Sequence, residues 1–184
     1  MGMAAAAQAQ LPHFFFSPSD SPPHFILHPA RSPQLPLQSR HTHSNHQNTQ
    51  VMKYFTLDEL TRSRTATRLG IDNTPTTEAT ACLKLLVEHV LDPLRQAWGR
   101  PIAVTSGYRC PQLNKAVGGV PGSQHLLGQA ADIVAGSPRD NARLYKLLQQ
   151  LRLPVDQAID EHGHQWLHVS YGPRNRRSYF SIDN

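Results

Sequence analysis

Apolar residues recur at helical spacing between Thr74 and Gly99. The repeat is formed by Leu83, Val87, Val90 and Leu94. Positions three or four residues apart share one face of a helix, so the pattern predicts a long helix that ends near Gly99. Thr74 followed by Pro75 is typical of a helix start, and Pro93 should kink the helix because proline lacks a backbone donor.

Two further helices are predicted from the residues at their starts. Thr56-Leu-Asp-Glu59 has the form of a capping box, so a short helix should begin there. Ser137-Pro138 should begin a third helix. The inner side of that helix is expected to consist of Leu144, Leu147, Leu148 and Leu151.

Short segments rich in apolar and β-branched residues predict strands. They are Ile102–Thr105, Ala130–Val134, Val155–Ile159 and Trp166–Tyr171. Helices and strands are interspersed without strict alternation. This order favours an α+β fold over a doubly wound sheet.

The segment SQHLLGQAAD, Ser123–Asp132, separates His125 from Asp132 by seven positions. A regular helix would set the two residues about 10 Å apart, and a strand would point them to opposite faces. Gly128 lies between them and suits a turn with unusual backbone angles. Asp132 follows in a predicted buried strand, where its carboxylate needs a partner. A metal ion shared with His125 would be such a partner.

His168 is the third candidate ligand. Alternation along its strand puts His168 on one face with Trp166 and Ser170. If this strand pairs with that of Asp132, the two side chains become same-face neighbours about 5 Å apart at Cβ. Two imidazoles and one carboxylate leave a position for water, as in catalytic zinc sites, although iron also accepts this set. From spacing alone, a core histidine and an aspartate that caps backbone groups are an equal alternative.

Composition changes near residue 51. Residues 1–51 are rich in Pro, Ser, His and Gln, carry little charge and show no periodicity beyond a short Phe14–Phe16 cluster. Such a segment cannot offset its ordering entropy, so we predict a disordered extension. Its six histidines are expected to be solvated rather than a metal site. The chain of 184 residues fits one folded domain, which we expect at residues 52–184.

The charge of the chain and its targeting signals bear on which partners and which cellular location to expect. No signal peptide or membrane span is evident. The net charge is +5, and the cluster of Arg174, Arg176 and Arg177 favours an anionic partner such as a cell wall. Nucleic acid is not expected because no reader motif is present. Cys82 and Cys110 share no spacing motif, so we expect structural or free thiols.

Three motifs together resemble the zinc D-alanyl-D-alanine carboxypeptidase-like peptidases. This family includes carboxypeptidases, dipeptidases and phage endolysins that cut the stem peptides of bacterial cell walls. The motifs are Ser-x-His-x-x-Gly-x-Ala-x-Asp at Ser123–Asp132, Ser106-Gly-Tyr-Arg-Cys110 with Asn114, and Trp166-Leu-His-Val-Ser170. The resemblance begins at Met52, which looks like a natural start for this family, so residues 1–51 are expected to be an extension or a mis-assigned start.

The resemblance implies Zn²⁺ as the cofactor, with His125, Asp132 and His168 as its ligands. It also implies the hedgehog/DD-peptidase-like α+β fold, in which helices pack on a small antiparallel sheet. On this basis residues 52–184 are predicted to be a zinc peptidase domain.

The expected general base is Glu161. Zinc lowers the pKa of bound water toward 7, so a nearby carboxylate can take its proton and later protonate the leaving amine. Glu161 ends the run Val155–Glu161, which contains a predicted strand, just ahead of His168, a pattern found in similar relatives. In several branches of the family the acid stands three residues before the final histidine, where this chain has Gln165. Asp160 and His164 are therefore alternative candidates for the base. The alternative for Glu161 itself is that it is an exposed loop acid without a catalytic role.

Arg109 is the second residue expected to be catalytic. Its guanidinium suits a carboxylate or a developing oxyanion, and the resemblance implies contact with the substrate. A surface ion pair is the alternative. Ser123 and Tyr108 are expected to line the substrate groove, with capping of the turn as an equal role for Ser123. Trp166 shares a face with His168 but is expected to be a core aromatic.

These observations predict a monomeric zinc metallopeptidase that hydrolyses peptidoglycan stem peptides, at a D-Ala-D-Ala or an L-Ala-D-Glu bond. A catalytically silent zinc module that binds the wall or a partner is the alternative, and a basic nucleic-acid binder is a third hypothesis. The protein should act on the cell wall, after phage-type release or in the periplasm. The missing leader favours phage-type release.

Overall fold

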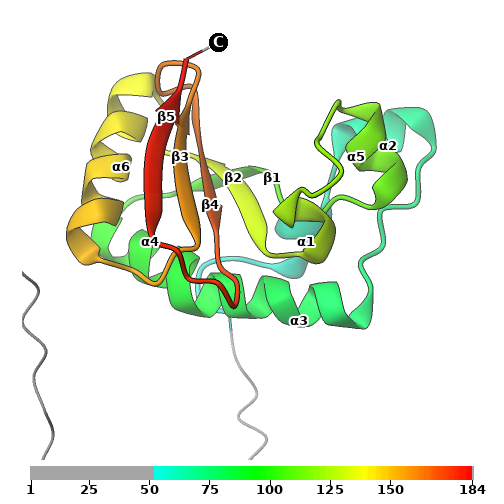
Figure 1. Cartoon of the computed structure of the whole chain (residues 1–184), viewed down its shortest axis with the longest axis horizontal. Coiled ribbons are helices and arrows are strands. Elements are labelled where there is room, and N and C mark those ends of the chain that lie inside the picture. Colours follow the sequence, from blue (N-terminus) through cyan, green and yellow to red (C-terminus); the bar gives the residue numbers. More distant parts are fainter. Residues whose placement is uncertain (1–51, 184) are drawn as a thin grey trace, which may run out of the picture. The chain divides into compact units, whose positions relative to one another are not determined.

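The structure is a computed structural model that describes residues 52–183 (Figure 1). The predicted disorder of residues 1–51 lies outside the described residues. The helical segments are α1 Leu57–Thr61, α2 Arg64–Leu69, α3 Thr77–Leu86, the π-helical turn η1 Val87–Leu91, α4 Asp92–Trp98, α5 Pro111–Ala116, the 3₁₀ turn η2 Gln124–Leu127 and α6 Pro138–Leu151. The strands are β1 Ala103–Ser106, β2 Ala130–Val134, β3 Gln157–Glu161, β4 Trp166–Ser170 and β5 Ser178–Ile182.

The five strands form one sheet in the order β1-β2-β4-β3-β5. The pairs β1–β2, β2–β4 and β3–β4 are antiparallel, whereas β5 pairs parallel with β3. The predicted α+β class is confirmed. The sheet is mixed rather than wholly antiparallel, because the unpredicted strand β5 runs beside β3 in the same direction.

The register of the sheet separates a core face from the opposite face, named the open face, on which Asp132 and His168 are themselves mostly buried. Asp132 lies opposite His168, and His168 lies opposite Ile159, so these residues share one face. The intervening positions belong to the other face and are buried in one hydrophobic core with residues of α3, η1, α4 and α6. The sheet contributes Ala131, Ile133, Ala158, Leu167 and Val169 to that core. Asp132 and His168 therefore project from the face opposite this core.

The long helix predicted before Gly99 is present with one irregularity. It begins at Thr77, two residues after the predicted Pro75, with Thr76 as its N-cap. The disruption expected at Pro93 takes the form of the π-helical turn Val87–Leu91 just ahead of it. A π turn of this kind accommodates local strain without ending the helix. The helix ends at Gly99, which has a left-handed backbone.

Most other predicted elements are present within two residues. The capping box at Thr56 and Glu59 is formed, and Ser137 caps α6. The strand predicted at Val155–Ile159 is shifted to Gln157–Glu161. On α6, Leu151 is 38% exposed, so its expected inward position is wrong. No helix in the described part of the chain has the length and apolar character needed to cross a membrane.

Candidate metal centre

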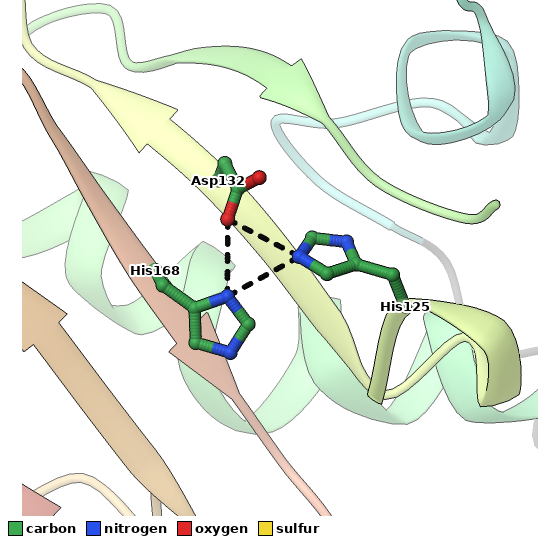
Figure 2. Close-up of side chains that lie close together, drawn as sticks. All are labelled: His125, Asp132 and His168. Atoms are coloured by element: carbon green, nitrogen blue, oxygen red, sulfur yellow. Dashed lines mark hydrogen bonds and ion pairs between the residues drawn. The ribbon is translucent and has the colours of Figure 1, made fainter. Parts of the chain in front are cut away.

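Three side chains from separate segments meet on the open face of the sheet (Figure 2). His125 comes from η2, Asp132 from β2 and His168 from β4. The Asp132 Oδ1 atom lies 3.2 Å from His125 Nε2 and 3.0 Å from His168 Nδ1, and the two nitrogens are 3.2 Å apart. Neighbouring donors of a tetrahedral zinc site, each about 2 Å from the ion, are separated by about 3.3 Å. The triangle has the size that a small divalent cation requires.

The backbone brings the three residues together as the spacing predicted. Asp132 and His168 are direct partners in the antiparallel β2–β4 ladder. Gly128 ends η2 with φ +68° and reverses the chain toward β2. A Cβ at this glycine would lie 2.3 Å from the carbonyl oxygen of Ala79 on α3. The site therefore needs glycine here both for the left-handed turn and for the close approach to α3.

Hydrogen bonding fixes which nitrogen of His125 faces the cluster. Its Nδ1 lies 2.6 Å from the carbonyl oxygen of Gly107, which can only accept, so Nδ1 carries a proton and donates. In the neutral ring Nε2 then presents a lone pair toward the Asp132 carboxylate, which is also an acceptor. Two acceptors at this distance repel unless a proton or a metal cation lies between them. The donor set thus fits a metal ion, and the Gly107 carbonyl orients one of its candidate ligands.

Arg109 contacts the other oxygen of the same carboxylate. Its Nη2 donates to Asp132 Oδ2 at 2.8 Å, and its Nε donates to Ser106 Oγ at 2.9 Å. Burial opposes ionisation of Asp132, but positive charge on the facing His125 and His168 nitrogens, supplied in the metal-free protein by a proton, outweighs burial and holds the pKa of this carboxyl well below its usual range. Asp132 is therefore ionised, as a metal ligand must be.

Arg109, in the turn before α5, contacts the candidate metal cluster, whereas Tyr108 and Ser123, also predicted to bind substrate, have other contacts. Tyr108 is only 5% exposed and packs in the hydrophobic core, so its contacts do not support the substrate-groove role expected for it. Ser123 accepts a long hydrogen bond of 3.4 Å from the backbone N–H of His125 and caps η2. Capping, one of the two roles expected for Ser123, is thus the one its contacts support.

The acidic residues proposed as base lie on different faces of β3. Glu161 pairs with Trp166 on the face of His168 and is partly exposed. Asp160 pairs with Leu167, which faces the core, and its carboxylate lies 2.5 Å from the His164 Nδ1 atom. Asp160 therefore points away from the metal cluster. Of the two acids, Glu161 is the one that lies on the same face of the sheet as Asp132 and His168.

Trp166 differs from its sequence interpretation. It is partly exposed and is absent from the hydrophobic core of the described residues. Its ring packs at 4.7 Å against that of His162, in the turn between β3 and β4. An alternating strand pattern gives the face of a residue but not what covers that face, which is why the sequence suggested burial. Trp166 lies on the open face beside Glu161 and within two positions of His168.

An ion pair between buried Asp156 and exposed Arg176, missed by the sequence analysis, supports the His125 turn. Asp156 is 1% exposed and accepts hydrogen bonds from the backbone N–H, Nε and Nη2 of Arg176 and from the Gln124 side chain. Gln124 directly precedes His125, so this carboxylate ties the turn to β3 and to the segment before β5. Arg176 belongs to the basic cluster noted in the sequence and is still exposed, but its guanidinium is engaged by Asp156. No local pattern signals the pair, because its members are 20 positions apart.

This ion pair predicts a loss of stability in acid. Hydrogen bonds from Arg176 outweigh burial and lower the pKa of Asp156 from 3.8 to about 2. A carboxyl whose pKa is lowered by folding stabilises the protein above its unfolded pKa, and the contribution of about 2 kcal/mol disappears as the pH falls from about 4 to below 2. Urea unfolding should show Asp156→Asn less stable than wild type at pH 7, with the difference shrinking toward pH 2. The exposed Asp58→Asn is the control, and a pH-independent difference would contradict the assignment.

Both cysteines are free thiols, as expected. Cys110 also accepts a hydrogen bond from the Leu113 N–H through its sulfur and caps α5. Neither thiol belongs to the candidate metal cluster found among the described residues.

Comparison with known proteins places this geometry in a family. The family model of peptidase M15 matches residues 53–170, more than half of the 184 residues. The chain therefore belongs to the M15 peptidases, and the predicted likeness to zinc D-alanyl-D-alanine carboxypeptidases is confirmed. The zinc D-Ala-D-Ala carboxypeptidase of Streptomyces albus G is 38% identical over 84 residues, which cover 45% of this chain and 32% of that relative. The match spans about a third of the length of this relative.

Proposed function

We propose that the chain is a zinc metallopeptidase that hydrolyses peptide bonds in peptidoglycan stem peptides. The observation that carries the proposal is the triangle of one carboxylate and two imidazole donors, 3.0 to 3.2 Å apart, on the open face of the sheet. Membership of the M15 peptidases and the likeness to a zinc D-Ala-D-Ala carboxypeptidase support the choice of reaction and metal.

In this proposal His125, Asp132 and His168 hold the zinc ion through Nε2, Oδ1 and Nδ1. The bound metal would supply a Lewis acid that activates water and polarises a carbonyl group. The carbonyl oxygen of Gly107 keeps His125 in the required tautomer. Arg109 holds the second oxygen of Asp132, which leaves Oδ1 for the metal.

Glu161 is proposed as the group that moves the proton. It takes a proton from the attacking water and delivers it to the amine of the departing peptide. Its position at the end of β3, on the face of His168, supports this role, and the opposite face of Asp160 counts against that alternative. Arg109 uses two of its five N–H donors on Ser106 and Asp132. The remaining donors are proposed to bind a substrate carbonyl or carboxylate.

A catalytically silent zinc module is the competing function, and turnover separates the two. Purified zinc-loaded protein incubated with peptidoglycan should release new amino groups, and mass spectrometry of the soluble fragments should identify the bond. A D-alanine product indicates carboxypeptidase action, whereas fragments that begin with D-glutamate indicate endopeptidase action. If zinc-loaded protein binds peptidoglycan but releases nothing, the silent module is correct and the peptidase proposal fails.

A further inference from the structure

A cleft of about 760 Å³ lies along the outer side of β1. One wall is the strand itself, Ala103–Ser106, and the other is the connection from the end of α1 into α2, Arg62–Thr65. The volume lies within the range of about 300 to 1,000 Å³ that is typical of ligand sites. The residues of the α1–α2 wall have no role in the proposed metal chemistry.

The cleft ends beside the candidate metal cluster, at two lining residues that border Asp132, and none of the three candidate ligands lines it. Ser106 and Arg109 line it, and the same two side chains are hydrogen-bonded to each other. Arg109 also donates to Asp132, and Ser106 is the register partner of Asp132 across β1 and β2. A ligand that occupied the cleft would therefore extend along β1 from Ser106 and Arg109, the two lining residues next to Asp132.

The strand wall can pair with an extended peptide. β1 is at one edge of the sheet, with β2 on its inner side. The outer row of backbone N–H and C=O groups of an edge strand is free to bond another extended chain. Thr105 and Ala103 are exposed on this strand, so the edge is accessible to such a ligand.

The opposite wall is positively charged. Arg62 and Arg64 line it, together with Glu59. The Glu59 carboxylate is engaged with the backbone and hydroxyl of Thr56. Arg62 pairs with Asp58, but both side chains are more than half exposed, and such a pair holds a guanidinium only weakly. Arg64 forms no ion pair with any residue that the structure describes. These side chains can turn to an anionic group in the cleft.

We infer that this cleft binds the stem peptide as an extended strand along β1, with a carboxylate of the peptide held by Arg62 and Arg64. The inference rests on the proposed function and adds its substrate preference, namely a peptide that carries a free carboxylate beside the bond to be cut. The group is the α-carboxylate of a γ-linked D-glutamate, which lies beside the L-Ala-D-Glu bond. Amidation of that carboxylate removes the charge without changing the length of the peptide.

The test compares two synthetic peptides, L-Ala-γ-D-Glu-L-Lys-D-Ala-D-Ala with a free glutamyl α-carboxylate and the same peptide amidated at that group. Calorimetry on zinc-loaded Glu161→Gln protein measures binding without turnover. Loss of a charged hydrogen-bonded partner weakens binding about tenfold. Arg64→Ala and Arg62→Ala should each lower the affinity for the acidic peptide by about this factor. Neither variant should change the affinity for the amidated peptide. Equal weakening of the acidic and the amidated peptide by the arginine variants would point instead to the terminal D-alanine carboxylate and overturn this assignment. Arg139→Ala, an exposed arginine on α6, is the charge-matched control and should change neither.

Kinetics on the same arginine variants in otherwise wild-type protein gives a second readout. KM for the acidic peptide should rise about tenfold while kcat and zinc content stay unchanged. If wild type cleaves peptidoglycan but these variants bind both peptides as wild type does, the cleft inference fails and the proposed function stands. If zinc-loaded wild type neither binds these peptides nor cleaves peptidoglycan, both fail.

Discussion

Replacing His168 by alanine is expected to abolish peptidoglycan hydrolysis and stoichiometric zinc binding together. His168 provides Nδ1, one corner of a triangle whose other two corners are 3.0 and 3.2 Å away. Zinc in catalytic sites of this kind is held by three protein ligands, and two ligands of this set are not expected to retain it. The measurements are release of amino groups from peptidoglycan and zinc content after dialysis.

His89→Ala is a matched control for this substitution. His89 is partly exposed and stacks on Tyr171, away from the three candidate ligands. This variant should keep both zinc and activity. Circular dichroism should confirm that His168→Ala remains folded, because the core face of β4 is unchanged. A folded His168→Ala protein with wild-type hydrolysis would contradict the proposed ligand set.

Glu161→Gln should lower kcat by about 10² to 10⁴, the range attributed to general acid–base catalysis. The amide keeps the size of the side chain but cannot accept the proton. Zinc content should equal that of wild type, because Glu161 is not a proposed ligand. Steady-state kinetics on a stem peptide, with metal analysis of the same preparation, measures both quantities.

Two matched variants sharpen the test of Glu161. Glu88→Gln makes the same change at an exposed position in η1 and should leave kcat unaltered. Asp160→Asn examines the alternative base on the opposite face of β3. If Asp160→Asn abolished kcat while Glu161→Gln kept the wild-type kcat, Asp160 would be the general base and the assignment of Glu161 would be wrong.

Local chemistry made the convergence of His125, Asp132 and His168 predictable from the sequence. Gly128 marked the chain reversal, and strand alternation gave the correct faces for Asp132 and His168. Their direct pairing across β2 and β4 followed from one assumption, that the two strands are neighbours. Each of these inferences uses residues close together in sequence or a simple period of two, which is where sequence patterns carry the most information.

The features that the sequence did not reveal depend on long-range contacts. Strand β5, Ser-Tyr-Phe-Ser-Ile, shows no clear alternation of apolar and polar residues, is partly or fully exposed at every position, and pairs with the edge of β3. The short helices α2 and α5 span too few residues to show a helical period. Tyr108 lies in a motif yet is buried, because the Tyr108 backbone N–H bonds to the Leu60 carbonyl and holds the turn against α1.

The central claim is that His125, Asp132 and His168 hold one zinc ion. Native mass spectrometry of the full chain, reconstituted with zinc and then exchanged into metal-free buffer, tests it most directly. The account predicts one zinc ion per chain in wild type and none when all three side chains are replaced by alanine. A wild-type protein that is folded yet free of zinc, or a triple variant that still carries one ion, would contradict it.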